Sequence, residues 1–212
     1  LRELQMRDTE LGEAVLQHHY QLFHNYDGVV AIMRRMKALA AGLAQHQESG
    51  SLPDTPEGTR ELSVLQQQIV RKADALEEFK SHNAVIKNSF LYLPRQVNAV
   101  LEGLPESQHD PFELLVRDLL LITLDQGEAA RELLRQHIDL VDRNISSLPD
   151  RAKTSARSVS LHARSILANE SDISKSLGQL SSLGGSGLGV ELERLYLDHY
   201  RAQQHIAATY RL

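Results

Sequence analysis

Apolar residues recur every three or four positions through most of the 212-residue chain, which is the spacing of helices that bury one face. The first such stretch runs from about Asp8 to Gln47 without a proline and predicts one long amphipathic helix. The turn-forming sequence ESGSLPDTPEG, residues 48–58, ends this helix. Its seam comprises Leu4, Leu11, Val15, Leu22, Val29, Ile32, Met36, Leu39 and Leu43.

A second stretch keeps one register from about Thr59 to Leu104, which is longer than ordinary globular helices and typical of bundles or coiled coils. Pro94 lies inside it and predicts a kink near residues 90–93, because proline removes a backbone hydrogen bond. The remaining seam positions are Leu62, Leu65, Ile69, Leu76, Phe79, Ile86, Phe90, Leu93, Val97 and Val100.

Three further helical stretches follow along the chain. One covers about residues 111–146 and is weakened around residues 124–127. The next begins after the turn SSLPD and continues to about Leu183. The sequence GGSGLG, residues 184–189, separates it from a last helix over residues 190–212, because glycine at this density breaks a helix.

These lengths predict an architecture. At 1.5 Å per residue the first two helices are each roughly 60 to 70 Å long. If they run antiparallel, Asn83 lies beside residues 23–25, and Gly127 and the run 184–189 reach the same height. We therefore predict an all-α fold, an elongated up-down-up-down helical rod forming two stacked four-helix bundles with both termini at one end. One half would contain residues 1–22, 84–126 and 190–212, and the other residues 23–83 and 127–189.

Composition supports an all-α class and narrows the function. Aromatic residues make up 5% of the chain, and tryptophan is absent. The net charge is -5 with scattered Lys and Arg, which argues against nucleic-acid and membrane-surface partners. The absence of cysteine excludes disulfides, thiolate metal sites and cysteine nucleophiles. The sequence contains no run of about 18 apolar residues, so we predict no transmembrane helix within residues 1–212. The ends, Leu1 and Leu212, predict a piece of a longer chain.

No catalytic or cofactor motif is recognisable. Ferritin-like metal sites need two Glu-x-x-His pairs on facing helices, and the only such pair here, Glu106 to His109, lies in a predicted turn. The glycine run 184–189 follows a helix rather than a strand, so it does not predict a phosphate loop. We therefore predict a non-enzymatic domain without a metal site or cofactor.

Polar residues within the apolar seams are the candidates for function. Asp8, His18 and Asn25 occupy seam positions of the first stretch, and Lys72 and Asn83 those of the second. An unpaired buried polar group costs roughly 1 to 3 kcal/mol, so each needs a partner. Asn83 either fixes the register between helices or lines a small polar pocket. The candidate ligand-binding residues are Asn25, Tyr26, Asp27, Asn83, Asn88 and Tyr92.

Two segments resemble a known family. The sequence FKSHNAVIKNSFLYLP, residues 79–94, together with LFHNYDGVV, residues 22–30, is similar to the DAHL domain, the double all-alpha helical ligand-binding domain. The resemblance spans nearly the whole chain. Its elements are Phe79, Lys80, Ser81, Asn83, Ala84, Asn88 and Ser89 in the first segment, and Tyr26 and Asp27 in the second.

The resemblance implies a periplasmic, extracytoplasmic sensor domain over residues 1–212 of an inner-membrane protein, with transmembrane helices on both sides. The half that contains both termini would be membrane-proximal. The parent chain would be a sensor histidine kinase or, alternatively, a diguanylate cyclase, and we expect a homodimer in the full-length receptor. The partner would be an unknown small molecule or a periplasmic solute-binding protein that docks on the bundle. A cytosolic coiled-coil scaffold or a di-metal enzyme remains a third alternative.

Overall fold

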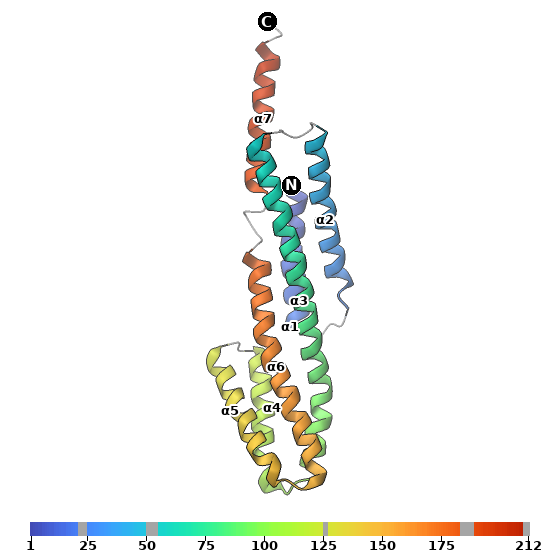
Figure 1. Cartoon of the computed structure of the whole chain (residues 1–212), viewed down its shortest axis with the longest axis vertical. Coiled ribbons are helices and arrows are strands. Elements are labelled where there is room, and N and C mark those ends of the chain that lie inside the picture. Colours follow the sequence, from blue (N-terminus) through green and yellow to red (C-terminus); the bar gives the residue numbers. More distant parts are fainter. Residues whose placement is uncertain (21–24, 50–54, 125–126, 183–188, 210–212) are drawn as a thin grey trace. The chain divides into compact units, whose positions relative to one another are not determined.

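The computed structural model describes residues 1–20, 25–49, 55–124, 127–182 and 189–209, and these residues are helical apart from short turns (Figure 1). The predicted all-α class is confirmed. The described α-helices are α1 (Arg2–Tyr20), α2 (Asp27–Glu48), α3 (Pro56–Leu101), α4 (Asp110–Leu124), α5 (Glu128–Asn144), α6 (Asp150–Ser182) and α7 (Val190–Thr209). Two short 3-10 turns, Glu106–Gln108 and Ile145–Ser147, precede α4 and α6.

The helices form two compact units. Unit 1 contains residues 1–78 and 176–212, and unit 2 contains residues 79–175. Unit 1 therefore comprises α1, α2, the first half of α3, the end of α6 and α7. Unit 2 comprises the second half of α3, α4, α5 and most of α6. The division into a membrane-proximal and a membrane-distal half stays a prediction.

The predicted single helix over residues 8–47 is wrong. It is replaced by α1 and α2, which pack against each other and run in opposite directions (Figure 1). Each helix buries one apolar stripe, with Leu11 and Val15 on α1 and Val29 and Met36 on α2 almost fully enclosed. Apolar residues spaced three and four apart are compatible both with one long helix and with two shorter helices that pack on each other. The spacing alone therefore did not reveal the break between α1 and α2. The predicted seam residue Leu22 lies outside the described residues.

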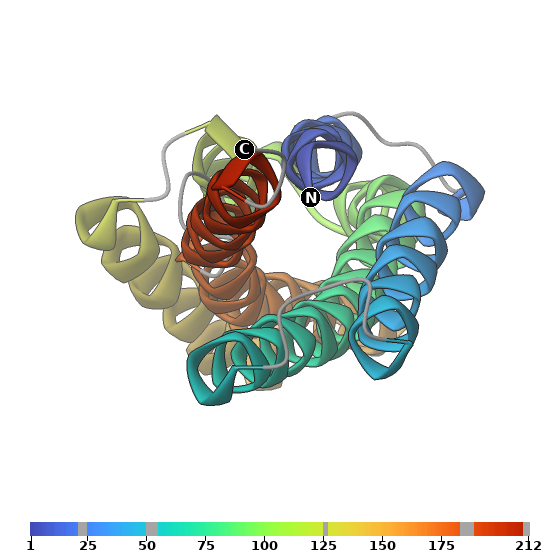
Figure 2. The same ribbon diagram turned by 90° about the horizontal axis from the view of Figure 1, so that it is seen from above.

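The first predicted helical stretch was expected to run antiparallel to the second. Of the two helices that replace it, only α2 runs antiparallel to α3. The Gln47 side-chain amide donates a hydrogen bond of 2.7 Å to the Thr59 hydroxyl, which places the end of α2 beside the start of α3. Seen end-on in Figure 2, α2 and the first half of α3 lie side by side. In contrast, α1 runs in the same direction as α3 (Figure 1).

A buried ion pair joins α1 to α3. The Lys72 ammonium donates to the Asp8 carboxylate, and both side chains are 3% exposed. These are two of the polar seam residues for which the sequence required partners, and they satisfy each other. The pair lies among fully enclosed apolar neighbours such as Leu4, Leu11 and Leu76.

The start of α7 lies at the start of α1. Arg2 and Glu193 are 3.4 Å apart, and a Cβ on Gly189 would lie 2.9 Å from the Leu1 side chain. Gly189 has a φ of 78°, a left-handed conformation that glycine adopts readily. The glycine run was expected at the height of Asn25, and for Gly189 this is wrong: Asn25 follows the other end of α1, roughly 28 Å away along that helix. Residues 184–188 lie outside the described residues.

Unit 2 is a four-helix bundle, as expected for each half of the chain. The predicted third helix over residues 111–146 is, however, two antiparallel helices, α4 and α5, that pack on each other. Tertiary packing favours two helices here, because α4 and α5 each bury a separate apolar stripe within one core. That core comprises Leu93, Val97 and Val100 on α3, Phe112, Leu115, Leu119 and Ile122 on α4, Leu134, Ile138 and Val141 on α5, and Ala152, Ala156, Val159, Ala163 and Ile166 on α6.

Candidate functional site

Three of the predicted site residues shape the connection from α1 to α2. The Asn25 side-chain oxygen accepts a 2.7 Å hydrogen bond from the Asp27 backbone N–H, which forms an Asx turn at the start of α2. The His18 Nε2 lies 2.8 Å from the Asn25 carbonyl, and the His18 ring stacks on Tyr26 with centroids 5.3 Å apart. Asn25 and Asp27 are exposed and Tyr26 is half-buried. Their observed contacts link the end of α1 to the start of α2.

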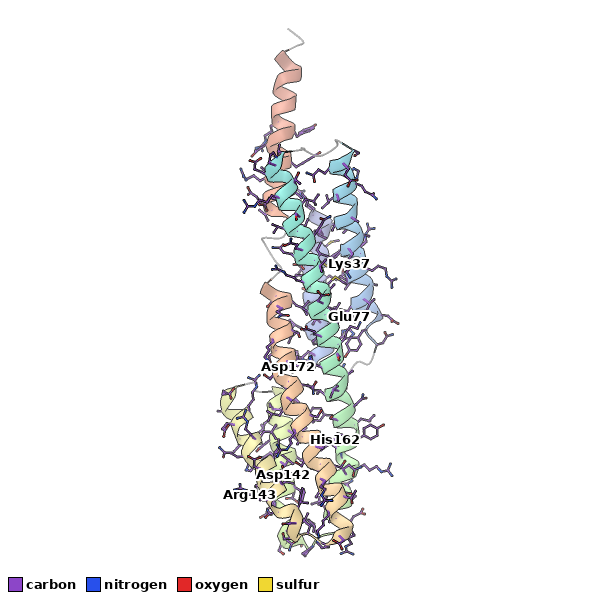
Figure 3. All side chains as sticks on the ribbon, in the orientation of Figure 1. Lys37, Glu77, Asp142, Arg143, His162 and Asp172 are labelled. Carbon is purple, nitrogen blue, oxygen red and sulfur yellow. The ribbon has the colours of Figure 1, made fainter. Side chains whose placement is uncertain are left out.

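The other three predicted residues belong to α3 in unit 2 and face different ways. Asn83 is 2% exposed and lies in the helix seam. Asn88 is exposed. Tyr92 is 54% exposed and stacks on His162, which Figure 3 labels on α6, with centroids 6.3 Å apart. Asn25, Tyr26 and Asp27 belong to unit 1, so a common pocket of all six residues stays a prediction.

Unit 2 also buries ionisable groups that sequence reasoning missed. Burial raises the pKa of the Glu170 carboxyl to about 7, although Arg131 favours its charged form. Burial lowers the pKa of the Lys87 ammonium. Glu170 lies between the core residues Ile166 and Ile173 at helical spacing, so its position in the register was the available signal.

A buried carboxylate in the same unit makes several hydrogen bonds within the protein. Asp118 on α4 is 2% exposed and accepts hydrogen bonds from Arg117 Nε and a terminal Arg117 nitrogen, at 3.0 and 2.9 Å. The His137 Nδ1 on α5 also contacts the other oxygen of this carboxylate. These bonds tie α4 to α5 and leave Asp118 little capacity for a ligand.

A cleft with charged walls lies within unit 1, between α2 and α3. It has a volume of about 250 Å³. Its floor is apolar, because Met33, Ala73 and Leu76 are 5%, 6% and 1% exposed. Its other lining residues are Val30, Arg34 and Lys37 on α2 and Asp74 and Glu77 on α3.

The charges on its rim are separated by sign. Arg34 and Lys37 are one turn apart on α2, and Asp74 and Glu77 are one turn apart on α3. Figure 3 labels Lys37 and Glu77 on these two neighbouring helices. The two basic side chains therefore come from one wall of the cleft and the two acidic side chains from the other. Such a cleft can contact an anionic and a cationic group at once.

A second groove in unit 1 is larger but its charges are already paired. It has a volume of about 660 Å³ and lies where α1, α2 and α7 meet. Arg2 pairs with Glu193 at 3.4 Å, and Glu3 pairs with Arg35 at 2.8 Å. Its lining residues are Leu1, Arg2, Glu3, Leu43, His46, Glu193, Tyr196 and Leu197.

Two further searches cover only the described residues. In that part of the chain no group of three or more His, Asp or Glu residues has the arrangement of a metal site. None of the described helices combines the length and apolarity that crossing a bilayer requires.

Comparison with known proteins gives one match. The family model of the DAHL domain matches residues 1–211. Neither a curated protein nor a solved structure matches the chain.

Proposed function

Because the chain belongs to the DAHL domain family, a family of sensor domains, we propose that it is the ligand-sensing domain of a membrane-bound signal-transduction receptor. The observation that carries this proposal is the family match over residues 1–211. The all-α architecture and the cleft between α2 and α3 support it. The proposed domain binds and relays, and we assign it no catalytic step.

The cleft offers a way to convert binding into a conformational signal. A ligand shifts a conformational equilibrium only if it binds one arrangement more tightly than another. Its two walls are separate helices, so a ligand that contacts both favours one spacing of α2 against α3. The α7 helix belongs to the same unit and contacts α1 through Arg2 and Glu193. We propose that a change in the packing of unit 1 is relayed to the last described helix through this contact.

The finer assignment follows from the family resemblance. We propose a periplasmic location, transmembrane helices on both sides in the parent chain, and a sensor histidine kinase as the parent, with a diguanylate cyclase as the alternative. The full-length receptor would act as a homodimer. The gene that encodes this chain tests the topology, because the proposal requires apolar helices before Leu1 and after Leu212.

A thermal-shift screen of the 212-residue chain tests the sensing role. A small molecule present at 100 times its dissociation constant stabilises the folded state by about 2.7 kcal/mol. We expect a confirmed ligand to change kinase or cyclase output in the full-length receptor. A flat response to a broad metabolite library, combined with specific binding of a solute-binding protein, would replace direct sensing with docking of that protein.

A further inference from the structure

We propose that the cleft between α2 and α3 binds a small zwitterion of the amino-acid class, with its carboxylate at Arg34 and Lys37 and its ammonium at Asp74 and Glu77. This inference rests on the proposed ligand-sensing function and names the ligand class for this cleft. It follows from the placement of charge, from the apolar floor and from the size of the site.

The charge argument begins with Arg34 and Lys37 on one wall of the cleft and Asp74 on the other. Arg34, Lys37 and Asp74 have no ion-pair partner within 4 Å in the described part of the chain. Elsewhere in this unit comparable side chains do pair between helices, as Arg35 does with Glu3 at 2.8 Å. These three charges are therefore available to a ligand that carries both signs and lies between the two walls.

The direction of the helices orders these charges along the cleft. Since α2 and α3 are antiparallel, with Gln47 beside Thr59, Lys37 lies nearer the start of α3 than Glu77 does. Figure 3 places the two labels in the same order along the helices. The basic end of the cleft thus precedes the acidic end along α3. A bound zwitterion has one preferred direction, because the reverse direction opposes like charges.

The floor and the volume select a compact ligand with an aliphatic body. The apolar side chains of Met33, Ala73 and Leu76 line the cleft beneath the charges and are themselves almost fully enclosed. A volume of about 250 Å³ falls below the roughly 300 Å³ at which pockets for drug-sized ligands begin. An aliphatic α-amino acid or a short ω-amino acid meets both requirements.

Binding at this cleft is energetically reasonable because the rim groups are exposed in the free protein. They pay no burial cost before the ligand arrives, and an exposed ion pair that they could form with each other would contribute little. A ligand that covers the apolar floor excludes water from the charged contacts, which strengthens each of them. The contacts to both helices are then made only in the bound state.

The test uses a matched set of probes on the 212-residue chain. The zwitterions are L-valine, L-leucine and 5-aminovalerate, and the controls with a single charge are valerate and pentylamine. Isothermal titration calorimetry and ligand-dependent melting measure binding. We expect at least one zwitterion to bind at least about tenfold more tightly than either control, because each charged hydrogen bond contributes to affinity.

Three variants locate the site. R34Q/K37Q removes the basic wall, D74N/E77Q removes the acidic wall, and A73L fills the space above the floor. We expect each to weaken binding of that zwitterion at least about tenfold. The first variant should also remove its preference over pentylamine, and the second its preference over valerate. If A73L does not fold, the two charge variants still test the site.

The matched control removes charges of the same kind elsewhere. Asp172 and Lys175 form an exposed ion pair on α6 in unit 2, and D172N/K175Q should leave binding unchanged. Failure of all three zwitterions to bind overturns the inference, as does binding that the cleft variants leave intact. If another compound from the broad library still binds, the sensing function stands. If no small molecule binds at all, the sensing function fails with the inference.

Discussion

The buried pair of Asp8 and Lys72 allows a quantitative prediction. Both side chains are 3% exposed and come from different helices of unit 1. Removing one partner of a buried ion pair leaves an uncompensated charge and typically costs about 3 to 5 kcal/mol. Replacing both partners by apolar residues of similar volume is often neutral or stabilising by about 1 to 4 kcal/mol. We therefore expect Lys72→Met to destabilise unit 1 by about 3 to 5 kcal/mol.

The double variant gives the opposite result. Asp8→Leu combined with Lys72→Met should restore the free energy of unfolding to within about 1 kcal/mol of the parent chain, or raise it. The matched control is Lys175→Met, which breaks an ion pair whose side chains are 70% and 41% exposed. Exposed pairs contribute less than about 1 kcal/mol, so this control should change little.

Urea unfolding followed by circular dichroism measures these differences, and hydrogen exchange assigns them to a unit. In Lys72→Met, amides of α1 should lose protection while amides of α4 and α5 keep it, because these helices belong to different units. A loss below about 1 kcal/mol in Lys72→Met would refute the reasoning, since it would show that the pair is solvated. A double variant as unstable as the single variant would refute the account of the uncompensated charge.

Three further predictions follow from single residues. The pKa of the Glu170 carboxyl is about 7 in the folded protein and 4.5 without burial. Between these two pH values the unfolded chain releases the proton more readily, so the free energy of unfolding should fall by roughly 3 kcal/mol as the pH rises. Glu170→Gln should flatten that fall in urea titrations. Gly189→Ala should cost about 1 kcal/mol or more in thermal unfolding because its φ is 78°, whereas Gly178→Ala, on an exposed helix face, should stabilise by about 0.5 to 1 kcal/mol. If Asn83 lines a pocket, Asn83→Leu should keep the fold and remove ligand-dependent stabilisation. If Asn83 fixes the register between helices, the same variant should populate several folded or oligomeric states, which sedimentation detects.

Helix ends marked by proline or by several glycines were predictable, and the reversals before α2 and α5, with weaker turn signals, were not. The long α3 and the start of α7 agree with the prediction because proline, glycine and serine punctuate the sequence around them. Between Tyr20 and Asp27 the apolar spacing continues without proline or glycine, and the local turn signal is Asn25, which accepts a hydrogen bond from the Asp27 backbone N–H. The reversal there depends on packing of α1 against α2, which the local pattern does not encode.

The polar residues show the same limit. The register identified Asp8 and Lys72 as buried groups that need partners. Their pairing places α1 beside α3, whereas the expected antiparallel register would have set these two residues far apart. Arg34, Lys37 and Asp74 escaped notice because charges one turn apart on an exposed helix face are usually solvated. Only the packing of α2 on α3 turns these ordinary charges into the walls of a cleft.

The order of the two units along the chain has a consequence for biosynthesis. Unit 2 is continuous in sequence, whereas unit 1 begins before it and is completed only by residues 176–212. As the ribosome delivers the chain from its N-terminus, the core of unit 2 can assemble while unit 1 still lacks α7. Until α7 emerges, the apolar surface that it covers in unit 1 stays open to chaperones and to misassembly.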